Sequence, residues 1–91
     1  MSDLLLGVDV GTSAVKAALV SAEGGVLAAS ERRCALSHPA PGRAEQRAED
    51  WWLALQAAVR DVTENVDAGR VRALGLSTQG GTLVPVDAEG R

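Results

Sequence analysis

The chain has 91 residues, a formal net charge of −3 and a single cysteine. This length allows one small domain with a thin core, and one cysteine excludes an internal disulfide. The basic residues form no cluster and no apolar run is as long as a membrane span, so neither nucleic acid nor the bilayer is an expected partner. The start also lacks a secretory signal, so we expect a cytoplasmic protein.

The first apolar stretch is interrupted by a short polar tip, Asp9-Val10-Gly11-Thr12-Ser13. Residues 4–10 and 13–21 have the length and β-branched content of strands, so the pattern predicts an antiparallel hairpin. We expect Gly11 to turn the backbone with a positive φ and to let a ligand approach. Successive backbone N–H groups in such a turn bind anions, and the two hydroxyl side chains add donors.

Asp9 would repel an anion that touched it directly. Its carboxylate is useful if a divalent cation lies between it and phosphate oxygens, usually through water. The tip therefore predicts a metal and phosphate site. The alternative is ordinary turn chemistry, in which the same residue types are common.

The chain continues with a predicted third strand, residues 26–32, after a turn whose glycines supply positive φ. Residues 34–47 contain prolines and a glycine and are expected to form a loop. In this segment we interpret His38 as a surface residue and Cys34 as an unreactive thiol, because neither has a partner pattern for catalysis.

A helix is expected from about Ala48, because apolar residues then recur at helical spacing. We expect the two tryptophans to anchor this helix on the sheet. The apolar face is predicted to contain Trp52, Leu55, Val59, Val62 and Val66.

Residues 71–77 are predicted to form a fourth strand, residues 78–81 a polar break and residues 82–86 a fifth strand. A strand–helix–strand connection is normally right-handed and joins parallel strands, so the first, third and fourth strands should end at one edge of the sheet. Ligands bind preferentially at that edge of open α/β sheets. A turn ends the sequence, so we expect the domain to continue beyond Arg91.

Three motifs resemble the N-terminal part of an FGGY-type carbohydrate kinase, in the superfamily that includes actin and the sugar kinases. They are Gly7–Ser13 followed by Lys16, Gly42–Gln46 followed by Glu49–Trp52, and Val71–Ser77 followed by Gln79. The resemblance implies an α/β, ribonuclease H-like (actin-like ATPase) half-domain. It would have a mixed sheet of about five strands, order 3-2-1-4-5, with one crossover helix. Residues 1–91 would form the first part of the first of two such domains.

The function implied by this resemblance is ATP-dependent phosphorylation of a sugar or polyol. Asp9 would hold the Mg²⁺ of magnesium-ATP, and Gly11, Thr12, Ser13 and Lys16 would contact the phosphates, which suits a reaction that needs mainly positioning and charge neutralisation.

The sugar side of the site is implied by the same resemblance. The residues implied there are Glu45, Gln46, Gln79, Gly80 and Gly81. The last two replace a Met-His or Arg-Glu pair of other family members, so the sugar itself is not implied.

The catalytic base of the family lies downstream, so no catalytic residue is expected within these 91 residues. The isolated chain should therefore transfer no phosphate at a useful rate. Two alternatives stay open, a non-catalytic nucleotide-binding relative and a remnant that self-associates through an exposed sheet surface.

Overall fold

The computed structural model describes residues 3–34, 41, 47–78 and 88. Within them the chain forms four strands, one long helix and a 3₁₀ turn, η1, at Ala68–Arg70. The long elements are β1 (Leu4–Val10), β2 (Ala14–Ser21), β3 (Val26–Arg33), α1 (Ala48–Thr63) and β4 (Val71–Thr78). The four strands and the start of the helix agree with the prediction to within one residue, whereas α1 ends at Thr63, before the last predicted helical residue, Val66. The predicted fifth strand lies outside the described residues.

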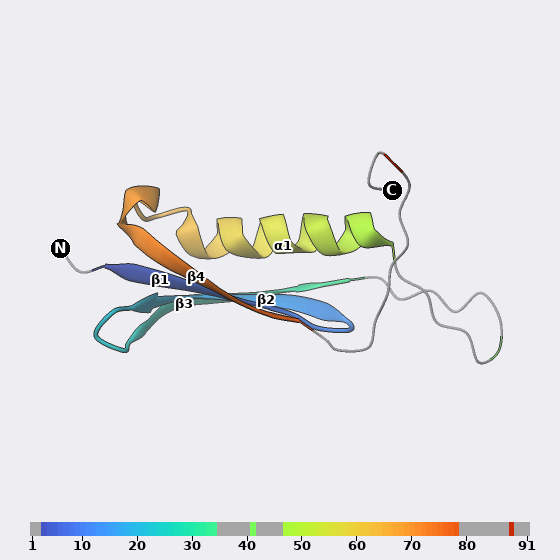
Figure 1. The fold of residues 1–91 in the computed structure, drawn as a ribbon, viewed down its shortest axis with the longest axis horizontal. Coiled ribbons are helices and arrows are strands. Elements are labelled where there is room, and N and C mark those ends of the chain that lie inside the picture. The colour runs from blue at the N-terminus through green and yellow to red at the C-terminus, as the bar shows by residue number, and fades with distance from the viewer. Residues whose placement is uncertain (1–2, 35–40, 42–46, 79–87, 89–91) are drawn as a thin grey trace.

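The sheet has the order β3-β2-β1-β4 (Figure 1). β2 is antiparallel to both β1 and β3, whereas β4 is parallel to β1. This confirms the predicted meander and the crossover through α1. The turn between β2 and β3 uses Gly24 at φ 104°, a conformation that glycine adopts without a steric penalty.

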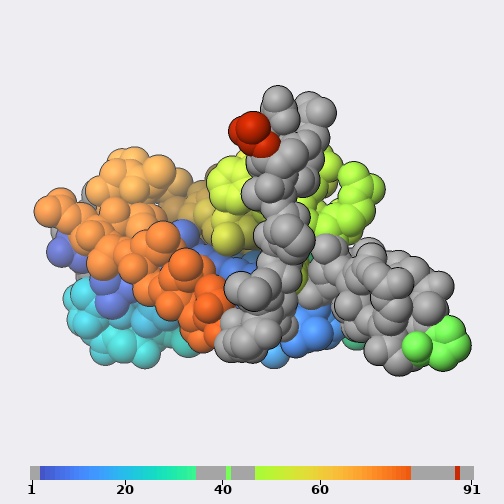
Figure 2. Space-filling view, turned by 45° about the vertical axis from the view of Figure 1, so that its right-hand side comes forward, coloured from blue at the N-terminus to red at the C-terminus, as the bar shows by residue number. Residues whose placement is uncertain are grey.

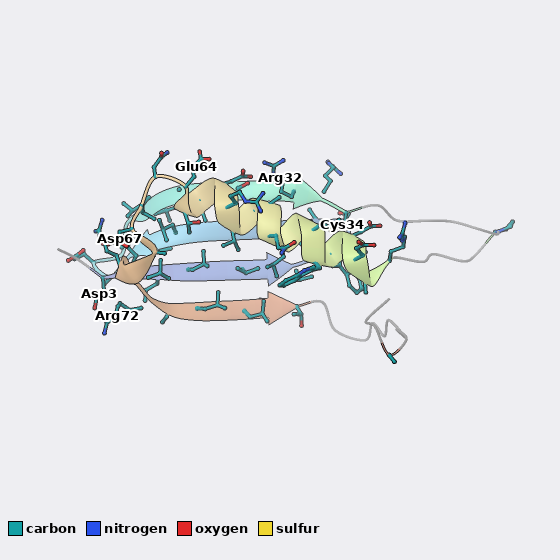
Figure 3. The ribbon with its side chains drawn as sticks, turned by 90° about the horizontal axis from the view of Figure 1, so that it is seen from above. Asp3, Arg32, Cys34, Glu64, Asp67 and Arg72 are labelled. Carbon is teal, nitrogen blue, oxygen red and sulfur yellow. The ribbon has the colours of Figure 1, made fainter. Side chains whose placement is uncertain are left out.

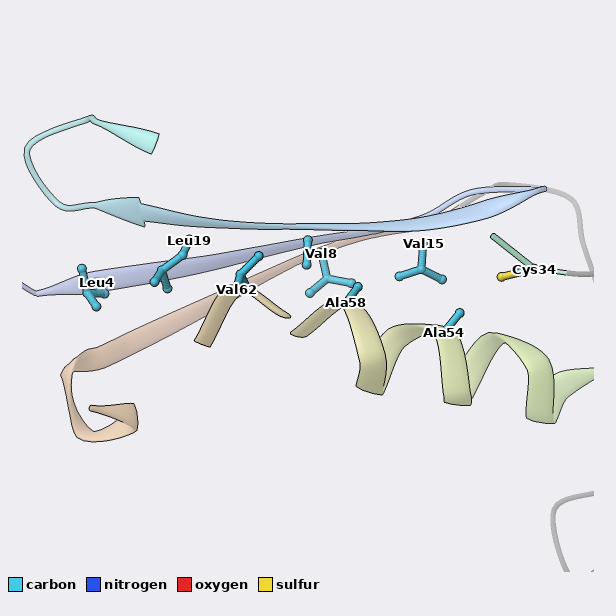
Figure 4. Close-up of a cluster of buried hydrophobic side chains, with 9 residues drawn as sticks. Leu4, Val8, Val15, Leu19, Cys34, Ala54, Ala58 and Val62 are labelled. Carbon is cyan, nitrogen blue, oxygen red and sulfur yellow. The ribbon is translucent and has the colours of Figure 1, made fainter. Parts of the chain in front are cut away.

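Helix α1 packs on one face of the sheet, and the core lies between them (Figure 4). The helix contributes Ala54, Ala58 and Val62, so small side chains let its backbone approach the strands. The predicted helical face is correct except at its start. Val62 is buried and Leu55, Val59 and Val66 pack against the core, whereas Trp52 is 58% exposed. Only Trp51 of the two tryptophans packs against the core, where it is partly buried.

A polar clamp joins α1 to β3 at the rim of this core. The Asp61 carboxylate accepts two hydrogen bonds from Arg32, from Nε and from a terminal guanidinium nitrogen, both at 2.7 Å. Ser30 donates a third hydrogen bond to the same carboxylate. The hydrogen bonds from Arg32 and then from Ser30 lower the pKa of Asp61 from 3.8 to about 2. The clamp therefore fixes the position of α1 over β3 while Asp61 is ionised.

The cover that α1 provides is incomplete. The helix packs mainly against β2 and β3, and β4 lies beside it (Figure 3). In the space-filling view β4 forms a continuous stretch of surface, drawn in orange (Figure 2). Leu74 and Leu76 are each 62% exposed on this strand. Residues 4–10 are apolar on both faces, which predicts a strand covered on both sides. In the described part, however, α1 covers one face of β1, and Leu5 on the other face is 39% exposed.

Within the described residues, no helix has the length and hydropathy needed to cross a membrane.

Candidate functional site

The polar segments begin at one edge of the sheet, as predicted. β1, β3 and β4 point the same way, so their carboxyl ends lie together (Figure 3). The Cys34 N–H donates to the Ser13 carbonyl at 2.8 Å, which ties the end of β3 to the hairpin tip. Thr78, the last residue of β4, pairs with Val10 at the end of β1. The hairpin tip after β1 and the segments that follow β3 and β4 therefore all begin at this edge of the sheet.

The predicted sugar-side residues lie outside the described residues and remain a prediction. They are Glu45, Gln46, Gln79, Gly80 and Gly81.

The hairpin tip is closed by a hydrogen bond from the Gly11 N–H to the Ala14 carbonyl, at 2.9 Å. The predicted positive φ at Gly11 was wrong, because among the described glycines only Gly24 has one. Glycine is favoured at position 11 for a different reason. A Cβ there would lie 3.1 Å from the Ala14 oxygen, which is closer than an ordinary contact. The two hydroxyl residues of the tip, Thr12 and Ser13, are exposed.

Asp9 and Lys16 lie opposite one another behind this tip. They are Cα partners in the β1–β2 ladder, and both are exposed. Their neighbours Val8, Val15 and Ala17 are buried beneath α1. Because successive side chains of a strand alternate between faces, Asp9 and Lys16 point to the face opposite α1. The carboxylate and the ammonium group are thus available together at the carboxyl edge of β1.

A hollow of about 870 Å³ lies on this open face. Its floor consists of small residues that pair across all four strands, so the backbone is accessible there. These residues are Ala29, Ala18, Gly7 and Gly75. At the carboxyl end the lining becomes polar, with one residue from each strand. These are Glu31, Lys16, Asp9 and Ser77.

Glu31 and Ser77 were not recognised from the sequence as site residues. The register places Glu31 opposite Lys16, and Ser77 opposite Asp9. The Lys16 Nζ lies 4.0 Å from a Glu31 carboxylate oxygen. Their positions follow from strand pairing, so a signal for them appears only once the register is known.

The Asp9 carboxylate at this edge suits Mg²⁺ bound mainly by water and phosphate, and does not suit a metal ion whose ligands all come from the protein. Among the described residues, no group of three or more His, Cys, Asp or Glu side chains could enclose a metal ion. Asp9 supplies one exposed carboxylate, and Mg²⁺ typically binds one or two carboxylates together with waters and substrate phosphates. The site fits a magnesium ion that arrives with a phosphorylated ligand.

Cys34 takes no part in this chemistry. Its thiol is buried at the end of β3, beside a smaller hollow of about 310 Å³ against α1. Burial, and next the negative charge of Asp50, raise the pKa of the thiol. Because the thiolate is the reactive form, this environment supports the interpretation of an unreactive cysteine. His38 lies outside the described residues.

The chain is similar to known proteins over nearly all of its length. Residues 4–91 match the N-terminal domain of the FGGY family of carbohydrate kinases. The chain is 37% identical over 90 residues to a xylulose kinase of Escherichia coli, covering 97% of this chain and 18% of the relative. It is 36% identical over 83 residues to a xylulose kinase of Klebsiella pneumoniae, covering 89% of this chain and 17% of the relative.

Solved structures show the same fold. A gluconate kinase from Lactobacillus acidophilus superposes with a TM-score of 0.88 at 26% identity, covering all of this chain and 18% of that one. The chain thus spans less than a fifth of the length of the relatives it matches. On this evidence the chain belongs to the FGGY family of carbohydrate kinases and corresponds to the N-terminal part of these proteins.

Proposed function

We propose that this chain supplies the magnesium and phosphate site, and part of the sugar site, of an ATP-dependent kinase for a sugar or polyol. The observation that carries the proposal is the pairing of exposed Asp9 and Lys16 behind the Gly11 tip, on one face and at one edge of the sheet. Membership of a carbohydrate kinase family supplies the class of reaction.

Each residue has a physical task in this proposal. The Asp9 carboxylate would hold waters of the magnesium ion, and Lys16 would offset the negative charge of the phosphates. Backbone and hydroxyl groups of Thr12 and Ser13 would donate hydrogen bonds to phosphate oxygens. The Gly11 N–H already closes the tip, so Gly11 would contribute by leaving room for the phosphates to approach. When bound, magnesium would neutralise phosphate charge. The chain's own contribution is to place and orient the phosphates at the carboxyl edge.

The nucleotide site is tested by NMR titration of the chain with a non-hydrolysable ATP analogue and Mg²⁺. We expect the backbone amide signals of Gly11, Thr12 and Ser13 to shift most. Asp9→Asn should weaken the magnesium-dependent part of the binding. Asp3→Asn is the matched control, because Asp3 is also exposed but precedes β1 at the opposite edge. Shifts confined to another region, or equal effects of the two variants, would contradict the proposal.

Phosphoryl transfer needs more than this chain is proposed to supply. We propose that the catalytic base and the closing second domain belong to a longer kinase, as the resemblance implies, and that Glu45, Gln46, Gln79, Gly80 and Gly81 face the sugar. The isolated chain should then form no ADP when sugars and polyols are added with magnesium-ATP. Sugar-dependent ADP formation by the pure chain would overturn the proposal that the catalytic base and the closing domain lie outside it.

A second candidate activity is self-association, which the exposed leucines of β4 favour. Leu74 and Leu76 lie on the last strand of the described sheet, on the face that carries α1 but beyond the part that the helix covers. Exposed apolar strands at a sheet edge are prone to pair with another copy. Sedimentation velocity should then show concentration-dependent dimers that Leu74→Ser reduces. A monomer at every concentration would exclude this candidate.

A further inference from the structure

One side chain from each strand contributes to a polar row across the open face. The ladder pairs Glu31 with Lys16, Lys16 with Asp9, and Asp9 with Ser77. Lys16 therefore lies between two carboxylates, one on each neighbouring strand. Cross-strand neighbours of this kind interact directly on their shared face.

The contact between Lys16 and Glu31 is loose. The Lys16 Nζ and the Glu31 oxygen are 4.0 Å apart, and the two side chains are 63% and 51% exposed. An ion pair this open to water is weak and is easily exchanged for another partner. Arg33, two residues beyond Glu31 on the same strand, pairs with Ala14 and adds a second cation nearer the tip. Near the carboxyl edge, the described strands thus bring two carboxylates, Asp9 and Glu31, and two cations, Lys16 and Arg33, to this face.

On the basis of the proposed function, we propose that Glu31 biases the phosphate site toward the magnesium-bound form of the nucleotide. Its carboxylate competes with an incoming phosphate for Lys16 and also repels phosphate oxygens. A nucleotide without magnesium meets the full repulsion, whereas the magnesium complex carries two fewer negative charges and meets less. Glu31 thereby favours the metal-bound nucleotide over the free one.

The size of the effect follows from charge and distance. Glu31 lies two strands from Asp9, and strands are spaced about 4.8 Å apart, so its carboxylate is roughly 10 Å from phosphates near Asp9. With the dielectric constant of water and little salt, removing this charge should tighten binding of the free nucleotide about threefold. The magnesium complex should gain less than about twofold, and physiological salt should reduce both effects.

The test compares Glu31→Gln with Glu64→Gln in the 91-residue chain. Both variants remove one negative charge, and Glu64 is an exposed residue at the end of α1. The probe is a non-hydrolysable ATP analogue, titrated at low salt with and without Mg²⁺. We expect Glu31→Gln to tighten metal-free binding about threefold and Glu64→Gln to leave it unchanged. In a Lys16→Met background the effect of Glu31→Gln should be smaller, because the competition for Lys16 is gone.

The outcomes separate this inference from the proposed function. Binding that responds equally to Glu31→Gln and Glu64→Gln, or that weakens in Glu31→Gln, overturns the role of Glu31 and leaves the nucleotide site intact. An unchanged effect in the Lys16→Met background contradicts the competition. No binding by the unmodified chain, with or without Mg²⁺, overturns the nucleotide site and the role of Glu31 with it.

Discussion

Leu19 and Leu74 occupy the same rung of the sheet in opposite surroundings. Both pair with Leu6, Leu19 from the antiparallel strand β2 and Leu74 from the parallel strand β4. Leu19 is 1% exposed beneath α1, whereas Leu74 is 62% exposed where the helix provides no cover. The same substitution, leucine to alanine, should therefore have very different effects at the two positions.

The magnitudes follow from burial. Leu19→Ala removes buried methyl groups and leaves a cavity, which should cost about 3 kcal/mol. A domain of this length has a free energy of unfolding of about 5 to 14 kcal/mol, so the loss is a large fraction of the total. The melting temperature should fall by about 12–24 °C. Leu74→Ala should cost less than about 1 kcal/mol, because most of that side chain is already in water.

The measurement is thermal and urea unfolding followed by circular dichroism, at a concentration where light scattering shows monomers. Low concentration matters because self-association would bury Leu74 and raise the apparent cost of its removal. Equal losses at the two positions would refute the reasoning, since they would mean that β4 is covered as well as β2. A Leu19→Ala variant as stable as the parent would refute the assignment of the core.

Two further predictions concern the tip and the polar clamp. Gly11→Ala should destabilise the chain by about 1 kcal/mol in urea unfolding, because its Cβ would lie 3.1 Å from the Ala14 oxygen. Gly7→Ala, with no atom within 4 Å of a built Cβ, should be neutral or stabilising, and a reversed order would contradict the tip geometry. The depressed pKa of Asp61 means that its hydrogen bonds with Arg32 stabilise the fold above pH 4 and are lost as the pH falls through about 2. The free energy of unfolding should therefore fall more steeply between pH 4 and pH 2 for the parent than for Asp61→Asn. Parallel curves for the two proteins would contradict the clamp.

Much of the architecture could be predicted without coordinates. Short apolar runs bounded by polar turns located the four described strands, and a handedness rule placed β1, β3 and β4 with their carboxyl ends together. The candidate phosphate tip was recognised because its residue types are local and contiguous. Asp9 and Lys16 were singled out for the same reason, although their pairing was not.

Other features depended on contacts between distant parts of the chain. The spacing of large apolar residues located most of the buried face of α1 but misplaced its first member, Trp52. It also did not identify Ala54 and Ala58, whose small side chains are buried where the helix approaches the sheet. The left-handed φ predicted at Gly11 was wrong, and what favours glycine there is the crowding of a Cβ against the Ala14 oxygen.

The sequence by itself determined which segments become strands, helix and turns, because propensity and periodicity act over a few neighbouring residues. Only the tertiary structure decided that Glu31, Lys16, Asp9 and Ser77 form one row, and that α1 covers β2 and β3 but leaves β4 exposed. Strand register and helix position are set by packing between residues far apart in the chain, where a shift of one residue would turn every side chain to the other face.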